Sequence, residues 1–219
     1  MSARSASSTE AVAPEVPRIG PNAVLQLVET LRAHGESALA GRVFERAGRA
    51  DWLAHPPETM VPQDAVLRVH AALWELLPRE TALQRAREAG LRTGDYLLAH
   101  RIPAPAQRLL RWLPASLAAR VLCRAIAAHA WTFVGSGAFA HDFRGGLRLT
   151  IGHNPLALRH SAEPDCVWHA AVFERLFRTL VHPRTTVREV ACTALGDPAC
   201  VFELRWDRDR GRGRASDGP

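Results

Sequence analysis

The stretch E-V-A-C-T-A-L-G-D-P-A-C-V-F-E-L-R-W, residues 189–206, decides how the end of this chain folds. It predicts two strands, residues 187–193 and 200–206, joined by a turn at the glycine, aspartate and proline of residues 196–198. Such a hairpin brings the two cysteines that flank the turn close together. The last part of the chain therefore contains antiparallel sheet.

Four potential metal ligands gather around this hairpin. Cys192 and Cys200 flank the turn, Glu189 lies just before them, and Cys166 begins a predicted helix at residues 166–180. Three thiolates and a carboxylate would fill a tetrahedral Zn²⁺ site and leave no open position, which is typical of a structural site.

Simple burial is the alternative, because cysteine is among the most buried residue types. Glu189 and Cys192 are also three residues apart, so on an ideal strand they face opposite sides and converge only if a bulge intervenes. A carboxylate among three cysteines is nonetheless unusual in an apolar core, which favours a metal. Cys123, on another predicted helix, is expected to be an ordinary core residue.

The remaining pattern predicts an α+β fold with a helical N-terminal part. Val24, Leu27, Val28 and Leu31 form a helical stripe after Pro21. A helix at residues 80–100 is expected to be interrupted near its two glycines, and residues 115–131 form one long helix. The predicted organisation is a disordered tail (1–16), a helical region (17–130), a part with helix, sheet and zinc site (131–206) and a disordered arginine-rich tail (207–219).

Composition limits the classes of function. The 219 residues are 47% hydrophobic, with a formal net charge of +6 and arginine as the only strongly basic residue type. The N-terminus lacks the apolar core of a signal peptide, and no apolar run of membrane-spanning length is free of charge. We therefore expect a cytoplasmic protein without a transmembrane segment. No nucleic-acid-binding signature accompanies the basic tail, so no nucleic-acid partner is expected.

The C-terminal ligand pattern resembles the V4R (vinyl-4-reductase) domain. That family shows a cysteine, then after a helix an E-x-x-C, a short turn and a final cysteine before an aromatic strand, here Cys166, Glu189, Cys192, Cys200 and Phe202. In phenol-sensing transcription activators with this domain, the corresponding residues bind structural zinc. The resemblance therefore implies the same ligand set here. It also implies a homodimer, because V4R domains often pair.

Residues 17–206 resemble the bacteriochlorophyll 4-vinyl reductase family. The motifs that carry the resemblance are R-I-G-P-N-A (residues 18–23), G-D-Y-L-L-A-H-R-I-P (94–103) and I-G-H-N-P (151–155). The resemblance implies a role in reducing the C8 (formerly 4-) vinyl group of divinyl protochlorophyllide or chlorophyllide. It also allows a location at the periphery of the photosynthetic membrane.

The residues do not indicate how electrons would arrive. No G-x-G-x-x-G follows a strand, and no cysteine run suits an Fe–S cluster. We therefore favour a protein that binds the tetrapyrrole and delivers it to a separate reductase. Two alternatives stay open: the vinyl reductase itself with an external reductant, and a small-molecule-sensing regulatory module.

A binding site for a Mg-tetrapyrrole needs apolar surface, an axial ligand for Mg²⁺ and cations for the propionate. Each candidate also has an ordinary structural explanation as core or surface residue. The candidate axial ligands are His129, His141 and His153. The candidate cations are Arg120, Arg124 and Arg144. The candidate apolar residues are Trp112, Trp131, Phe133, Phe139 and Trp168.

Overall fold

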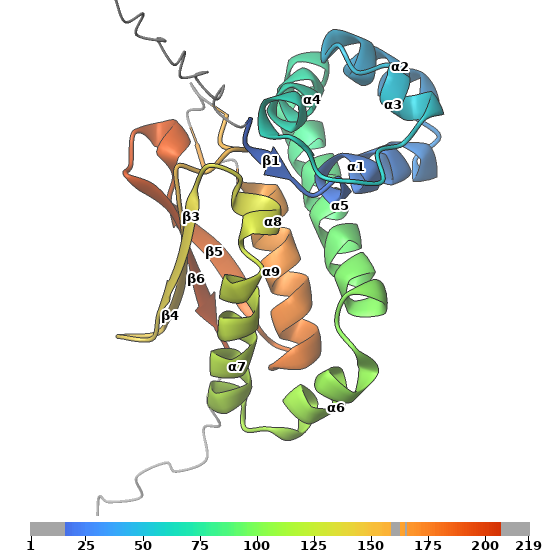
Figure 1. Ribbon diagram of the computed structural model, residues 1–219. Coiled ribbons are helices and arrows are strands. Elements are labelled where there is room, and N and C mark those ends of the chain that lie inside the picture. The colour runs from blue at the N-terminus through green and yellow to red at the C-terminus, as the bar shows by residue number, and fades with distance from the viewer. Residues whose placement is uncertain (1–15, 159–162, 165, 207–219) are drawn as a thin grey trace, which may run out of the picture.

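The computed structural model describes residues 16–158, 163–164 and 166–206. Within them the predicted α+β fold is confirmed: helices lead into a four-stranded antiparallel sheet with strand order β3-β4-β6-β5. Figure 1 shows helix α9 between this sheet and the long helix α5, with α1–α4 gathered at the far end of α5. The two tails predicted to be disordered lie outside the described residues, except for Val16.

The helices of the N-terminal part follow the apolar stripes of the sequence. In the first helix, Val24, Leu27, Val28 and Leu31 are all buried, as the spacing predicts. Strand β1 (Arg18–Ile19), just before α1, pairs antiparallel with β2 (Val61–Pro62), just before α4, and forms a two-stranded sheet. The helices are α1 (Asn22–Ala33), α2 (Ser37–Arg46), α3 (Asp51–Ala54), α4 (Gln63–Leu76) and α5 (Arg79–His100).

Helix α5 is continuous, so the interruption expected near its glycines was wrong. Gly90 and Gly94 do not break the helix, because they form its contact with α9 (Val167–Leu180). A Cβ on Gly90 would lie 2.8 Å from the Cβ of Ala171 and even closer to the Trp168 carbonyl oxygen. The glycines therefore allow close approach of two helices, and burial compensates for their low helix propensity.

The helix predicted over residues 115–131 is also shorter than expected. Helix α7 covers Ala115–Ala128, and Trp131 begins the separate short helix α8 (Trp131–Val134). His129 ends α7 by leaving the helical conformation, and its Nδ1 lies 2.9 Å from the Ala125 carbonyl oxygen, which is a C-terminal capping contact. Helix α6 (Ala104–Trp112) precedes α7, and both contact α9.

The sheet contains one strand that the sequence pattern missed. Strand β3 (Ala138–Asp142) pairs with β4 (Leu147–Gly152) at the sheet edge, in a segment for which the sequence predicted no strand. The remaining strands are β5 (Thr186–Ala191) and β6 (Ala199–Arg205). The expected hairpin between them is present, although its connection also contains the short helix η1 (Thr193–Leu195) before Gly196, which has a φ of +93°.

A β-bulge interrupts β5 beside its last residues. Glu189 pairs with Phe202, and Ala191 pairs with Val201, so Val190 is an additional residue on this strand. The bulge shifts the alternation of side chains between the two faces of the sheet. Glu189 and Cys192 can therefore point to the same side, which is the condition that the sequence set for their convergence.

Candidate metal centre and ligand groove

The structure brings together all four residues predicted to bind metal. Cys166 lies at the start of α9, Glu189 on β5, Cys192 just after β5 and Cys200 on β6. One possible ligand atom from each residue lies within 4.8 Å of all the others. The three thiols are buried, as expected for a closed structural site.

The sulfur positions have the dimensions of a tetrahedral site. The Sγ atom of Cys166 lies 3.6 Å from that of Cys192 and 3.3 Å from that of Cys200. The remaining pair, Cys192 and Cys200, is 3.9 Å apart. Zn–S bonds of about 2.3 Å in a tetrahedron would place the sulfurs roughly 3.8 Å apart. The three separations, from 3.3 to 3.9 Å, are close to this value, so the cluster has the size of a metal centre.

Glu189 provides an independent test of this fit. Its Oε2 accepts a hydrogen bond from the backbone N–H of Cys166 at 3.1 Å. Its Oε1 is buried and has no hydrogen-bond partner among the described residues. An unpaired buried carboxylate oxygen is costly, and a metal ion would satisfy it.

The sulfurs also receive hydrogen bonds typical of metal-bound thiolates. The side-chain N–H of Asn154 donates to Cys166 Sγ at 3.2 Å and to Cys200 Sγ at 3.4 Å. The backbone N–H of Thr193 donates to Cys200 Sγ at 3.4 Å. Such contacts orient ligands and stabilise their charge. The sequence analysis did not assign roles to Asn154 and Thr193, although Asn154 lies within the I-G-H-N-P motif.

The ionisation of the cluster follows from its burial and its mutual contacts. Burial raises the pKa of Glu189 to about 7. Hydrogen bonds with Cys166 and Cys192 lower the pKa of the Cys200 thiol, whereas contacts with Cys192 and Cys200 raise the pKa of Cys166. The three thiols therefore do not ionise independently of one another. A divalent cation would favour the deprotonated form of all four groups.

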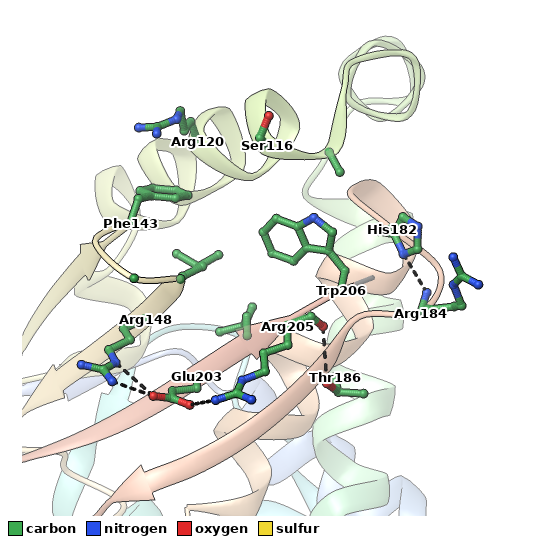
Figure 2. A pocket seen from close by; sticks show the side chains of 15 residues that line it. Ser116, Arg120, Phe143, Arg148, His182, Arg184, Thr186, Glu203, Arg205 and Trp206 are labelled. Atoms are coloured by element: carbon green, nitrogen blue, oxygen red, sulfur yellow. Dashed lines mark hydrogen bonds and ion pairs between the residues drawn. The ribbon is translucent and has the colours of Figure 1, made fainter. Parts of the chain in front are cut away.

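A separate groove of about 1270 Å³ lies between α7 and the ends of strands β4, β5 and β6. Figure 2 shows the rings of Phe143 and Trp206 facing this space, with arginine side chains around them. The guanidinium of Arg120 lies 4.5 Å from the centre of the Phe143 ring. Glu203 pairs with Arg148 at 2.7 Å and with Arg205 at 3.0 Å. The groove thus combines aromatic surface with positive charge.

The structure separates the residues predicted to bind the tetrapyrrole. Arg120 lines the groove, whereas Arg124, His129 and Trp131 are exposed along the outer side of α7 and α8. His153 is exposed in a turn with a φ of +49°.

The predicted aromatic residues also fall into different environments. Phe133 and Phe139 pack against each other and against Phe173, with ring centres 5.7 to 6.3 Å apart. His141 on β3 has ring contacts with Phe139 on the same strand and with Phe143 just after it. Three further candidates are placed elsewhere: Trp112 is 88% exposed, Trp168 is buried, and Arg144 pairs with Asp142. Among the groove residues, the sequence analysis missed Phe143, Arg148, His182, Arg205 and Trp206 as candidates.

Helices with the length and apolar character to cross a lipid bilayer are not found in the described part of the chain.

Comparison with known proteins places these features in a family context. Residues 147–206 match the V4R domain model, and this segment contains all four residues of the metal cluster. The chain is 50% identical over 188 residues to the bacteriochlorophyll synthase 23 kDa chain of Cereibacter sphaeroides, which covers 85% of this chain and 90% of the relative. It is 45% identical over 189 residues to the protein of the same name from Rhodobacter capsulatus, covering 86% and 87% respectively.

Proposed function

This chain belongs to the family of the bacteriochlorophyll synthase 23 kDa chain, and from that membership we propose that it acts in bacteriochlorophyll biosynthesis. Its proposed role is to bind a chlorophyll-type Mg-tetrapyrrole, divinyl protochlorophyllide or chlorophyllide, and to deliver it for reduction of the C8 vinyl group. The observation that carries the proposal is the identity of 50% across nearly the whole of a relative with that name. Delivery implies a separate reductase as partner, at the cytoplasmic periphery of the photosynthetic membrane.

The groove beside α7 is the proposed binding site. A chlorophyll-type macrocycle is flat and apolar and carries a propionate, so it requires aromatic surface together with a cation. Phe143 and Trp206 offer the surface, and Arg120 offers the cation. Arg120 forms no ion pair with another described residue, so its charge is available to a carboxylate. The groove volume also suffices for a ligand larger than a typical drug molecule.

The proposed metal is one structural Zn²⁺ held by Cys166, Glu189, Cys192 and Cys200. Zn²⁺ supplies a tetrahedral cross-link between protein ligands and is redox-inactive. The thiol-rich set and the dimensions of the sulfur triangle favour zinc over Mg²⁺ or Ca²⁺, which prefer oxygen ligands. With all four positions taken by side chains, the site would stabilise the fold around α9 and the hairpin.

Titration of the purified chain with divinyl protochlorophyllide, with and without NADPH, tests the proposed function. We expect the absorbance of the pigment to shift on binding, without conversion to the monovinyl product. Conversion by this chain and NADPH alone would instead support the alternative that it is the vinyl reductase with an external reductant. Absence of binding would contradict both, and binding of simple phenols alone would favour a sensing module.

Two matched variants locate the site. We expect Arg120→Ala to weaken binding about 10-fold or more, since a hydrogen bond to a charged group contributes roughly 1.5–3 kcal/mol. Arg49→Ala is the control, because Arg49 also stacks on an aromatic ring, that of Trp52, but lies away from the groove, in the connection between α2 and α3. Equal effects of the two substitutions would exclude the groove as the binding site.

A further inference from the structure

The exposed apolar side chains of this protein are concentrated on three consecutive helices. Eight large apolar side chains are exposed among the described residues, and five of them lie on α6, α7 and α8. These five are Leu109, Trp112, Leu117, Val121 and Trp131. Trp112 is the extreme case, with 88% of its surface open to solvent. Exposed large apolar side chains that are concentrated in one segment indicate a site of interaction with a partner or a membrane.

Helix α6 exposes an apolar stripe on the side opposite to its core contact. Arg108, Leu109 and Trp112 are exposed and lie at positions that share one side of a helix, whereas Leu110 is 6% exposed and faces the core. On α7, Leu117 and Val121 repeat the pattern four residues apart. Both helices therefore carry apolar residues on an outer side that would ordinarily be polar.

The segment that contains α6, α7 and α8 carries only positive charge. The sequence contains no aspartate or glutamate between Asp95 and Asp142, and its charged residues there are arginines. Arg108, Arg111 and Arg124 are exposed next to the apolar side chains, and none of them forms an ion pair with another described residue. The surface formed by Leu109, Trp112, Leu117 and Val121 with these arginines is named here the α6–α7 surface.

We propose that the α6–α7 surface docks this protein on an anionic lipid bilayer. Exposed tryptophan and leucine between arginines is the pattern of a helix that lies in the headgroup region, with its apolar side chains in the acyl boundary. A second copy of the chain fits the same surface poorly. A two-fold interface would place arginines against arginines, because the segment has no acidic residue to pair with them.

Flotation of the full-length protein with lipid vesicles tests this proposal without reference to pigment. We expect binding to vesicles made of one part phosphatidylglycerol and two parts phosphatidylcholine, and little binding to phosphatidylcholine alone. Leu109→Ser with Trp112→Ser should weaken binding about 10-fold or more through lost apolar contact. Arg108→Glu with Arg111→Glu should weaken it at least about 30-fold, since each basic residue near such a surface contributes roughly 1 kcal/mol.

Three control variants make the outcome decisive. Leu195→Ser removes an apolar side chain of similar exposure to that of Leu117, and Arg42→Glu reverses an exposed charge on α2. Both should bind vesicles as the unchanged protein does. A full-length variant with Arg208, Arg210, Arg212 and Arg214 changed to Gln tests the C-terminal tail.

Two results would overturn the proposal. Loss of vesicle binding only when the tail arginines are changed would assign the interaction to the tail. If the paired Ser variant keeps its vesicle binding but changes from dimer to monomer in light scattering, the surface is an interface between copies. Either result leaves the pigment titration unaffected, so this inference and the proposed function fail separately.

Discussion

Gly94 on α5 packs directly against Arg175 on α9: a Cβ atom built on Gly94 would lie 2.6 Å from the Cβ of Arg175. One helical turn earlier, Gly90 has the same relationship to the backbone of α9 at Trp168. The two helices thus meet through glycines over two successive turns. The ion pair of Arg175 with Asp95, at 2.6 Å, lies at the edge of this contact.

The glycine contact predicts the effect of adding one methyl group. Gly90→Ala should lower the free energy of unfolding by about 1–3 kcal/mol, because the Trp168 carbonyl oxygen is backbone and cannot move aside cheaply. Gly41→Ala on α2 is the matched control, since no atom lies within 4 Å of its added Cβ. That variant should gain up to about 1 kcal/mol from helix propensity. Urea unfolding of both measures the difference, and equal effects would refute the close contact.

The metal cluster predicts that substituting a cysteine inside the cluster lowers the metal content, whereas substituting Cys123 outside it does not. If the cluster holds the proposed zinc, Cys192→Ala should contain less of it and unfold at a lower temperature, because three ligands no longer close the site. Cys123→Ala should keep its zinc, since Cys123 is buried alone on α7, where burial raises the pKa of its thiol to about 12. Elemental analysis of the purified variants decides this, and equal zinc content in both would contradict the assigned ligands.

The bulge in β5 predicts an unusual sensitivity to deletion. Removing Val190 should restore regular pairing between β5 and β6 and turn Cys192 away from Cys166 and Cys200. Zinc content should then fall to near zero. Val190→Ala should keep the metal, because Val190 is 43% exposed and its side chain is not part of the site. A deletion variant that retained zinc would show that the bulge does not set the ligand geometry.

His169 predicts a dependence of stability on pH. Burial among Phe173, Phe202 and Trp168 lowers the pKa of His169 from its ordinary 6.5 to about 4. The unfolded chain therefore takes up a proton below pH 6.5, while the folded chain does so only near pH 4. The contribution of His169 to stability is complete above pH 6.5 and is lost as the pH falls toward 4, by up to about 3 kcal/mol.

The variant His169→Phe should lack the part of the pH dependence of stability that His169 causes. The difference in unfolding free energy between the variant and the unchanged protein should grow in favour of the variant as the pH falls from 6.5 to 4. The difference at pH 8 measures the packing of the new ring alone and is the internal control. His70, also buried and with a lowered pKa, is present in both proteins. A difference independent of pH would show that His169 is not held neutral by its surroundings.

Local sequence patterns predicted the structure correctly where buried residues recur at a regular spacing. The stripe of α1 follows from residue spacing, the hairpin of β5 and β6 follows from its turn residues, and residue type and order predicted the four residues that the fold brings into one cluster. The continuity of α5 could not be predicted from local sequence, because Gly90 is favoured there by its close contact with α9, a helix that lies far away in sequence. Strand β3 was missed because an edge strand with small residues has little alternation to detect.

The groove could not be predicted from the sequence, for a different reason. Arg120, Phe143, His182 and Trp206 come from separate segments, and only the folded chain brings them to one space. Their sequence neighbourhoods share no motif. Asn154 is an intermediate case, since the motif around it was recognised, while its hydrogen bonds to two sulfurs required coordinates.

The positions of the metal ligands have a consequence for synthesis on the ribosome. Cys166 and Cys200 are 34 residues apart, and all four ligands lie in the last quarter of the chain. Helix α5 therefore emerges from the ribosome long before its glycine-lined side can be covered by α9, and α9 emerges before the hairpin that completes the metal site. The nascent chain must keep this contact surface free of aggregation until α9 and the hairpin of β5 and β6 have been synthesised, so limiting zinc should reduce the yield of folded protein more than its rate of synthesis.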